Sequence, residues 1–176
     1  MFITIFAYMM HWSISLGHKH KIFRPIIRKG NELIFNLCYR GYVKKGYSAW
    51  DHFWVPAMVK LGQVRAPYIK KTMSVNVNDP KQLGAYHDYE DPIFGVTGHW
   101  ETNDKSDAVR VETACQLCDH IMKVTNGKGC PEFCRRIVGS MEQATGQAMN
   151  STYTVEIESL LVEGDASCRF IHKLQE

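Results

Sequence analysis

Cysteines are the residues of this chain best suited to chemistry, and five of the six follow residue 114. They form a C-x2-C pair (Cys115, Cys118), a C-x3-C pair (Cys130, Cys134) and a single Cys168. On helices these spacings put each pair on one face, so the four paired thiols could bind zinc or an iron–sulfur cluster. Inert buried thiols and a reactive thiol facing a ligand are the open alternatives. We therefore expect no obligatory cofactor, with cysteine-bound zinc as the exception.

The position of a thiol relative to a helix start affects its reactivity. Cys115 is expected to enter a helix from a strand, and Cys130 comes directly before Pro131, which suits a first helical turn. The positive end of a helix dipole lowers the pKa of a thiol there and favours the thiolate. Either residue could thus be a nucleophile.

The C-terminal segment places a thiol and an imidazole on one strand face. Strand alternation predicts that Cys168, Phe170 and His172 share one face, with Arg169 on the other. Four strand residues span about 13 Å, so thiol and imidazole could act only from opposite sides of a substrate. The alternative is that Cys168 and Phe170 are core residues and that His172 lies at a frayed end.

Further polar and aromatic residues of this region could bind a substrate. Arg110, Arg135 or Arg169 could hold a carboxylate, Asp119 or Asp165 could orient a base, and His120 could move protons. His99 and Trp100 could line a pocket wall. Solvated surface positions are the alternative for the arginines, Asp119 and His120, and core packing is the alternative for Trp100.

The acidic run His87–Asp91 offers oxygen ligands for a hard metal ion, but its carboxylates are bunched rather than spaced as in a calcium loop. A solvated acidic loop is the preferred interpretation. No Gly-rich phosphate loop, H-E-x-x-H or G-x-S-x-G motif occurs, which argues against a P-loop nucleotidase, a zincin and an α/β-hydrolase.

Hydrophobic periodicity predicts the elements that must position these residues. The 3.6-residue period predicts helices over 25–45, from Ser48 with a break near Pro56, and from Asp79-Pro80. Period-two alternation predicts strands over 95–102, 108–114, 153–161 and 167–174, with helices over 115–125 and after Pro131 between the pairs. We expect an α+β fold: N-terminal helices, then a four-stranded antiparallel sheet with two helices packed on one face. Residues 25–176 would form the single domain and residues 1–24 an N-terminal extension.

Composition and charge limit the partners. The 176 residues are 45% hydrophobic with a net charge of +3, and the basic residues are scattered, so no nucleic-acid partner is expected. The apolar residues 1–16 lack the preceding positive charge of a secretory signal and are short for a membrane span. We expect a cytoplasmic protein with a small-molecule substrate, no membrane partner and an open alternative of homo-oligomers.

Part of this pattern resembles a known family. A strand ending near Cys115, a helix carrying Cys134 and a closing Gly164-Asp165-x-x-Cys168-x-Phe170 hairpin resemble the L-2-amino-thiazoline-4-carboxylic acid hydrolase family. More distantly, residues 164–170 resemble the end of a 4-vinyl reductase ligand-binding domain. The resemblance implies hydrolytic opening of a cyclic amidine, such as a 2-amino-thiazoline carboxylate, to a carbamoyl-cysteine product.

The resulting hypothesis is a hydrolase that opens a C–N bond of a small cyclic amidine in a cysteine-lined pocket. The candidate catalytic residues are Cys115, Cys134, Cys168 and His172, and the candidate substrate-binding residues are His99, Trp100, Arg110, Asp119 and His120. The alternative is a non-catalytic sensor or carrier domain for a small aromatic or heterocyclic ligand, with or without cysteine-bound zinc.

Overall fold

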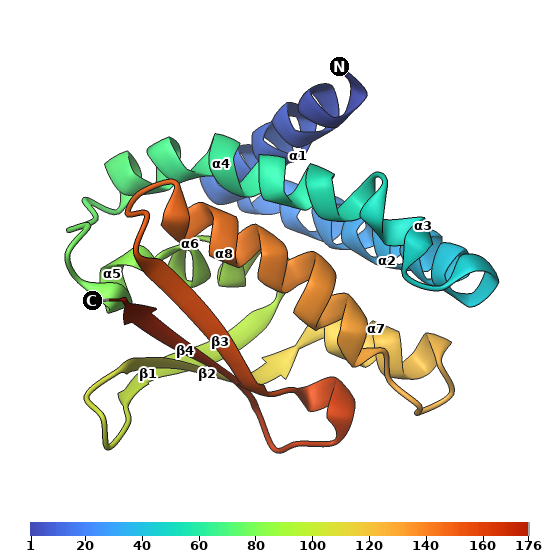
Figure 1. Ribbon diagram of the computed structural model, residues 1–176. Coiled ribbons are helices and arrows are strands. Elements are labelled where there is room, and N and C mark those ends of the chain that lie inside the picture. Colours follow the sequence, from blue (N-terminus) through green and yellow to red (C-terminus); the bar gives the residue numbers. More distant parts are fainter. Residues whose placement is uncertain (176) are drawn as a thin grey trace.

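Helices cover one face of a four-stranded antiparallel sheet in the computed structural model, which describes residues 1–175. The strand order is β1-β2-β4-β3, and every neighbouring pair is antiparallel. The N-terminal helices lie farthest from the sheet, and the later helices lie between them and the strands (Figure 1). The predicted α+β class and four-stranded sheet are confirmed.

Two hairpins build the sheet. The first joins β1 (Val96–Thr102) to β2 (Ala108–Cys115), and the second joins β3 (Tyr153–Ser159) to β4 (Cys168–Leu174) through the 3-10 turn Leu161–Glu163. Gly164 ends that turn at φ 91°, a left-handed conformation that glycine adopts without strain. All four strands lie where the alternating pattern predicts them.

The N-terminal half is helical, with α1 (Phe2–Lys19), α2 (Arg24–Lys45), α3 (Ser48–Asp51) and α4 (Trp54–Thr72). A 3-10 turn over Lys21–Phe23 connects the first two helices. Cys38 is fully buried on α2, as its place in the apolar stripe predicts. The expected break falls between α3 and α4, just before Pro56, because proline is tolerated in the first turn of a new helix.

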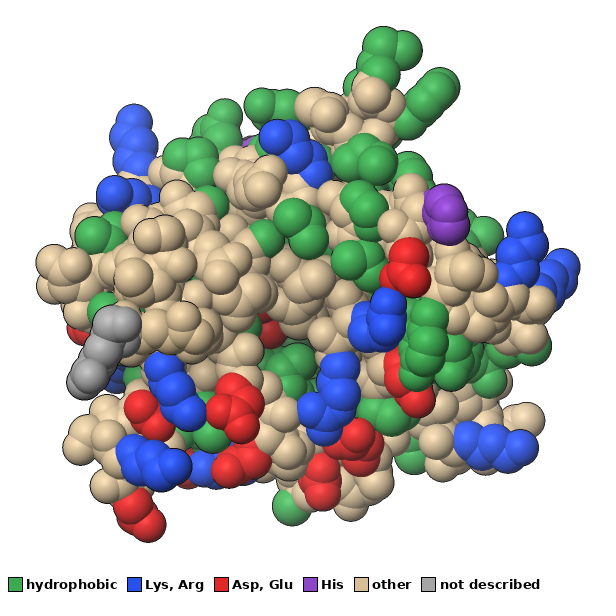
Figure 2. Space-filling view, viewed as in Figure 1, with side chains coloured by type: hydrophobic (Ala, Val, Ile, Leu, Met, Phe, Trp, Pro, Cys, Tyr) green, Lys and Arg blue, Asp and Glu red, His purple; other side chains and the backbone are tan. Residues whose placement is uncertain are grey.

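Helix α1 packs against α4 and α6 through one face that carries Ala7, His11, Ile14 and Gly17. Its other face leaves apolar side chains exposed, and they project from the end of the molecule near the N-terminus (Figure 2). Among residues 1–175, no helix combines the length and the apolarity that crossing a lipid bilayer requires.

Two short helices lead into the sheet, α5 (Pro80–Leu83) and α6 (Tyr86–Phe94). The Asp79 carboxylate accepts hydrogen bonds from the amides of Lys81 and Gln82, which is the predicted cap. The prediction of a solvated acidic loop over residues 87–91 was wrong. These residues form α6, and His87, Glu90 and Asp91 face the interior, since i, i+3 and i+4 positions share one helix face.

The last helices come between the two hairpins in the sequence. Helix α7 (Gln116–Val124) begins directly after Cys115, and a helix from residue 131 contains the π-helical stretch Phe133–Val138 and continues as α8 (Gly139–Gln147). Helices α4 and α8 approach closely at Gly62, where an added Cβ would lie 2.4 Å from the Met141 carbonyl oxygen. Glycine is therefore required for this contact.

The two faces of the sheet differ in an unexpected way. The helix-covered face carries Arg110, Glu112 and His172, all buried, whereas Val109 and Val111 lie on the opposite face. Those valines form a small buried cluster with Ile171. Charged side chains cover this outer face, and Figure 2 shows acidic and basic groups interspersed over this part of the surface.

Candidate functional site

An internal cavity of about 130 Å³ lies between the helices and the inner face of the sheet. Its walls come from α1, α2, α4, α6, β1, β2, α7, the π-helical stretch, α8 and β4. Most of the lining is apolar, with thiols on β2, α7, the π-helical stretch and β4, and carboxyls on α6, β2 and α8. The apolar lining includes Met10, Ile14, Ile34, Met58, Leu61, Phe94, Leu117, Phe133, Ile137, Met141, Leu160 and Phe170.

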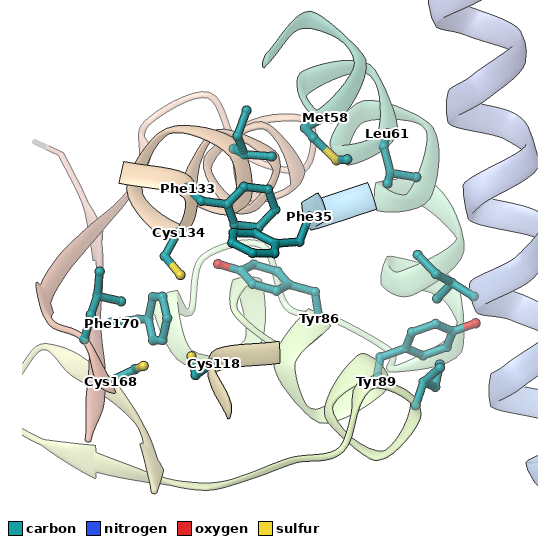
Figure 3. Close-up of a cluster of buried hydrophobic side chains, with 14 of the residues drawn as sticks. Phe35, Met58, Leu61, Tyr86, Tyr89, Cys118, Phe133, Cys134, Cys168 and Phe170 are labelled. Atoms are coloured by element: carbon teal, nitrogen blue, oxygen red, sulfur yellow. The ribbon is translucent and has the colours of Figure 1, made fainter. Parts of the chain in front are cut away.

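Four thiols line the cavity, those of Cys115, Cys118, Cys134 and Cys168. Figure 3 shows Cys118, Cys134 and Cys168 with their sulfur atoms gathered around the ring of Phe170. Cys118 is the central member, because the other three thiols all lie close enough to affect its pKa. The fold thus brings together the three cysteines named as catalytic candidates, and it adds Cys118.

The thiols of Cys118 and Cys168 differ in acidity. Hydrogen bonds with the thiols of Cys115, Cys134 and Cys168, followed by burial, raise the pKa of Cys118 far above its usual range. The pKa of Cys168 is lowered, first by the Cys118 thiol and then by the Leu161 amide, which donates to Sγ at 3.3 Å, while burial opposes both. Cys168 is therefore the thiol that this hydrogen-bonded group favours as thiolate.

The zinc hypothesis grouped Cys130 with Cys115, Cys118 and Cys134, and the structure does not. Cys130 is buried but does not line the cavity. It lies close enough to Cys38 to add to the effect of burial, which raises the pKa of Cys38 to about 12. Cys168, and not Cys130, lies beside the other three thiols, because β4 pairs with β2.

Carboxyls and an imidazole form the polar wall of the cavity. His87, Glu90 and Asp91 come from α6, Glu112 from β2 and Glu142 from α8, and each is at least nine-tenths buried. His87 Nδ1 lies 3.0 Å from Oε1 of Glu112. In residues 1–175, oxygen or nitrogen atoms of His87, Asp91 and Glu112 lie within 4.8 Å of one another.

Two buried guanidiniums balance part of this negative charge. Arg65 forms an ion pair with Glu90 and donates from Nε to Thr145 Oγ1 at 2.8 Å. Arg110 forms an ion pair with Asp91 and a second with Asp88 at 3.2 Å. Arg110 was expected as a substrate-binding residue or a solvated one. It is 4% exposed, and the solvated alternative was wrong.

Burial raises the pKa of the carboxyls of the polar wall, including that of Asp91, which is paired with Arg110. Burial raises the pKa of Glu112 to about 7, although Arg110 lowers it. Burial and the Glu112 charge raise the pKa of Asp91 to about 8, and the same two causes hold the pKa of Glu142 well above its usual range. Burial lowers the pKa of His87 well below its usual range, so the imidazole is neutral. These raised pKa values indicate that Arg65 and Arg110 do not fully balance the charge of the buried carboxyls.

His172 lies outside the cavity lining, in a hydrogen-bonded chain. Its Nδ1 lies 2.6 Å from the Tyr153 hydroxyl, which in turn lies 3.0 Å from the Tyr86 hydroxyl. Its side chain is fully buried, so the alternative of a frayed end was wrong. His172 shares the inner face with Cys168, as predicted, but its hydrogen-bond partner is a tyrosine and not the thiol.

The remaining candidates are dispersed. Trp100 donates from Nε1 to Asp88 at 3.0 Å, and its ring lies tilted beside that of His172, outside the cavity lining. His99 lies on the outer face beside Glu101, and Asp119 is exposed on α7. His120 contacts Asn36 of α2 at 2.9 Å. The other candidate groups bond locally: Arg135 to Glu163, Arg169 to Glu101 and Glu158, and Asp165 to the Leu160 amide.

Several residues of the polar wall escaped sequence reasoning. Glu142 and Arg65 lie within amphipathic helices, where a single charged residue has no local signal of burial. His87 and Asp91 did carry a signal, because their i, i+4 spacing places both on one face if the run is helical. The capped start at Asp79 made a following helix the better interpretation of that run.

Comparison with known proteins gives a fold but no family. No family model and no curated protein matches the chain. A crystal structure of a trafficking protein particle complex subunit 3 from Naegleria fowleri, covalently bound to palmitic acid, is similar with a TM-score of 0.60. The match covers 89% of this chain and 98% of that chain at 12% sequence identity. At this identity the likeness concerns the fold alone.

Proposed function

We propose that this protein is a non-catalytic binding domain that holds a small aromatic or heterocyclic ligand in the internal cavity. The observation that carries the proposal is a mostly apolar cavity between the helices and the sheet, with a set of buried polar groups in its lining. Pre-formed apolar pockets with a few converging polar groups are typical ligand sites. The structural neighbour, which by its description holds palmitic acid covalently, supports a ligand-binding use of this fold.

The size of the cavity supports a compact ligand rather than a long acyl chain. Its volume of about 130 Å³ is close to that of an engineered protein cavity of about 150 Å³ that binds benzene. An unbranched sixteen-carbon chain would need the walls to move. A single ring fits without such movement, so a one-ring or small two-ring ligand is the better match.

The polar wall supports a ligand that donates hydrogen bonds or carries positive charge. Glu90 Oε1 and Glu142 Oε2 have no hydrogen-bond partner among the described residues, and both side chains line the cavity. A ligand N–H facing these oxygens would satisfy them, whereas a ligand carboxylate would add charge to a wall that is already acidic.

Binding of three ring compounds of similar size would test this proposal. With EDTA present, we expect benzamidine and indole to raise the melting temperature and to give heat in calorimetric titration, and benzoate to do neither. At one hundred times its dissociation constant a ligand stabilises the fold by about 2.7 kcal/mol, which a melting curve detects. Absence of binding by both benzamidine and indole at millimolar concentration would contradict the proposal.

A cavity-filling variant links any binding to this site. Cys134→Phe places a ring among the thiols and should abolish binding of the compounds that bind wild type. Cys130→Ser is the control, because Cys130 is equally buried but does not line the cavity. Equal binding by both variants would place the ligand elsewhere.

A hydrolase acting on a cyclic amidine is a second candidate, favoured by one observation. The Leu161 amide donates to Cys168 Sγ at 3.3 Å, in a cavity that also carries buried carboxyls, and this suits a thiolate nucleophile facing an amidinium. Incubation with 2-amino-thiazoline-4-carboxylate, followed by mass spectrometry for carbamoyl-cysteine, is the test. Turnover that Cys168→Ser abolishes would favour this candidate, and absence of turnover by wild type would remove it.

A further inference from the structure

The polar wall contains more negative than positive groups, and this imbalance points to a cation. Four carboxyls line the cavity, those of Glu90, Asp91, Glu112 and Glu142. Two guanidiniums, Arg65 and Arg110, pair with Glu90 and Asp91. Glu112 and Glu142 have no guanidinium of their own among the described residues. One divalent cation would restore neutrality with all four carboxyls ionised.

The geometry supplies donors of the right kind at one place. His87 and Asp91 stand one turn apart on α6, and Glu112 faces them from β2. Candidate ligand atoms of these three residues lie within 4.8 Å of one another, a separation that one ion at about 2 Å from each can bridge. Arg110 donates to Oδ2 of Asp91, so this carboxylate can join the guanidinium to a cation through its two oxygens.

Unpartnered polar atoms give an independent reason. His87 is 3% exposed and Glu142 is 6% exposed, yet Nε2 of His87 and Oε2 of Glu142 have no hydrogen-bond partner among the described residues. Both residues line the cavity. Buried polar atoms without partners are rare and costly, and an ion is one recognised way to satisfy them.

We propose that His87, Asp91 and Glu112 form a site for one divalent transition-metal cation, with Glu142 facing the same cavity as a further oxygen donor. One imidazole with carboxylate oxygens suits Mn²⁺, Fe²⁺ or Zn²⁺. The site does not depend on the proposed ring ligand, and it adjoins the thiols, because Glu112 is the cross-strand partner of Cys168.

Binding of Mn²⁺ to the full chain, after removal of metals with EDTA, would test the site. Mn²⁺ is the chosen probe because it prefers oxygen and nitrogen donors, so the thiols compete poorly for it. Loss of the free-ion signal in electron paramagnetic resonance should report one Mn²⁺ per chain. Glu112→Gln and His87→Gln should each weaken binding at least tenfold, and Cys118→Ser should leave it unchanged.

The chain offers a matched control on the other face of the sheet. His99 and Glu101 also form a histidine–carboxylate pair, with Nε2 and Oε1 2.9 Å apart, but they are exposed. His99→Gln should leave Mn²⁺ binding unchanged. If His99→Gln weakened Mn²⁺ binding while His87→Gln and Glu112→Gln did not, the ion would bind at the surface, and the proposal would be overturned.

A measurement on wild type keeps the test decisive if the buried variants fail to fold. Electron spin echo spectra of bound Mn²⁺ should show coupling to an imidazole nitrogen, and this coupling should persist in His99→Gln. Absence of one-to-one binding, absence of nitrogen coupling, or binding that survives both His87→Gln and Glu112→Gln would each overturn the proposal.

Discussion

The two faces of the sheet distribute polar and apolar groups in opposite ways. The inner face, against the helices, carries the ion-paired Arg110 and the histidine-bonded Glu112, and both are buried. The outer face carries Val109 and Val111, equally buried, beneath surface ion pairs such as Arg169 with Glu101. A soluble sheet covered on one side usually shows the reverse arrangement.

This contrast indicates what the inner face is for. Burying charge is costly, and a fold that needed only stability would place valines under the helices and arginine in water. Charges instead lie where the cavity lies, and the apolar residues Val109 and Val111 of the same strand lie on the face that carries the surface ion pairs. The arrangement is that of a sheet whose inner face serves a site.

The largest expected effect comes from removing the buried guanidinium of Arg110. Arg110→Met should lower the free energy of unfolding by about 3–5 kcal/mol, because Asp91 would be left as an uncompensated buried carboxyl. Urea denaturation measures this change. Arg169→Met on the outer face is the matched control, and its pairs with Glu101 and Glu158 are partly exposed. Its expected cost is about 0–1 kcal/mol, and equal costs would refute the contrast between the faces.

A smaller effect should follow truncation of the outer apolar cluster. Val109→Ala should cost about 2 kcal/mol in urea denaturation, because Val109 is completely buried although it lies on the solvent side of the sheet. Val43→Ala on α2 is the control, since that valine is 67% exposed, and it should change stability little. A negligible cost for Val109→Ala would mean that the ion pairs do not enclose the cluster.

The smallest effect concerns pH. The pKa is raised to about 7 for Glu112 and to about 8 for Asp91, while unfolded carboxyls titrate near about pH 4. The unfolded chain therefore releases these protons first, and the free energy of unfolding should fall as pH rises toward 8, by an amount on the order of 1–2 kcal/mol above pH 6.5. His87 and His172 have lowered pKa values and oppose this trend only below about pH 6.5.

Variants on the two faces separate the groups responsible for this pH dependence. In EDTA, Glu112→Gln should flatten the fall of unfolding free energy between pH 6.5 and 8, since it removes one of the carboxyls whose pKa is raised. Glu101→Gln should leave the slope unchanged, because Glu101 lies exposed on the outer face. A slope that rises with pH in wild type would show that the buried carboxyls are already ionised.

Local patterns in the sequence were sufficient to predict the elements. The cap at Asp79, the strand alternation around Arg110 and the glycine turn at Gly164 each depend on residues close in sequence, and the structure has all three. Alternation also correctly placed Cys168, Phe170 and His172 on one face, because the two-residue period is a property of the strand itself.

The features that could not be predicted depend on contacts between residues far apart in the sequence. Alternation says which residues of β2 share a face, but not which face the helices will cover. Arg65 contacts Glu90 and Thr145, which belong to elements far from it in the chain. No local sequence pattern therefore indicates that these side chains are buried. Cys168 joins Cys118 for the same reason, because the pairing of β4 with β2 brings them together.

The walls of the cavity begin at Met10 and end at Phe170, which has a consequence for biosynthesis. A ribosome must release almost the whole described chain before the first helix can meet the last strand. Until then the cavity-lining residues of α1 and the Cys118 thiol of α7 lack the cover of β4, so nascent chains expose them to chaperones and oxidants. A ligand that fills this cavity can therefore act only as a late stabiliser of the finished fold.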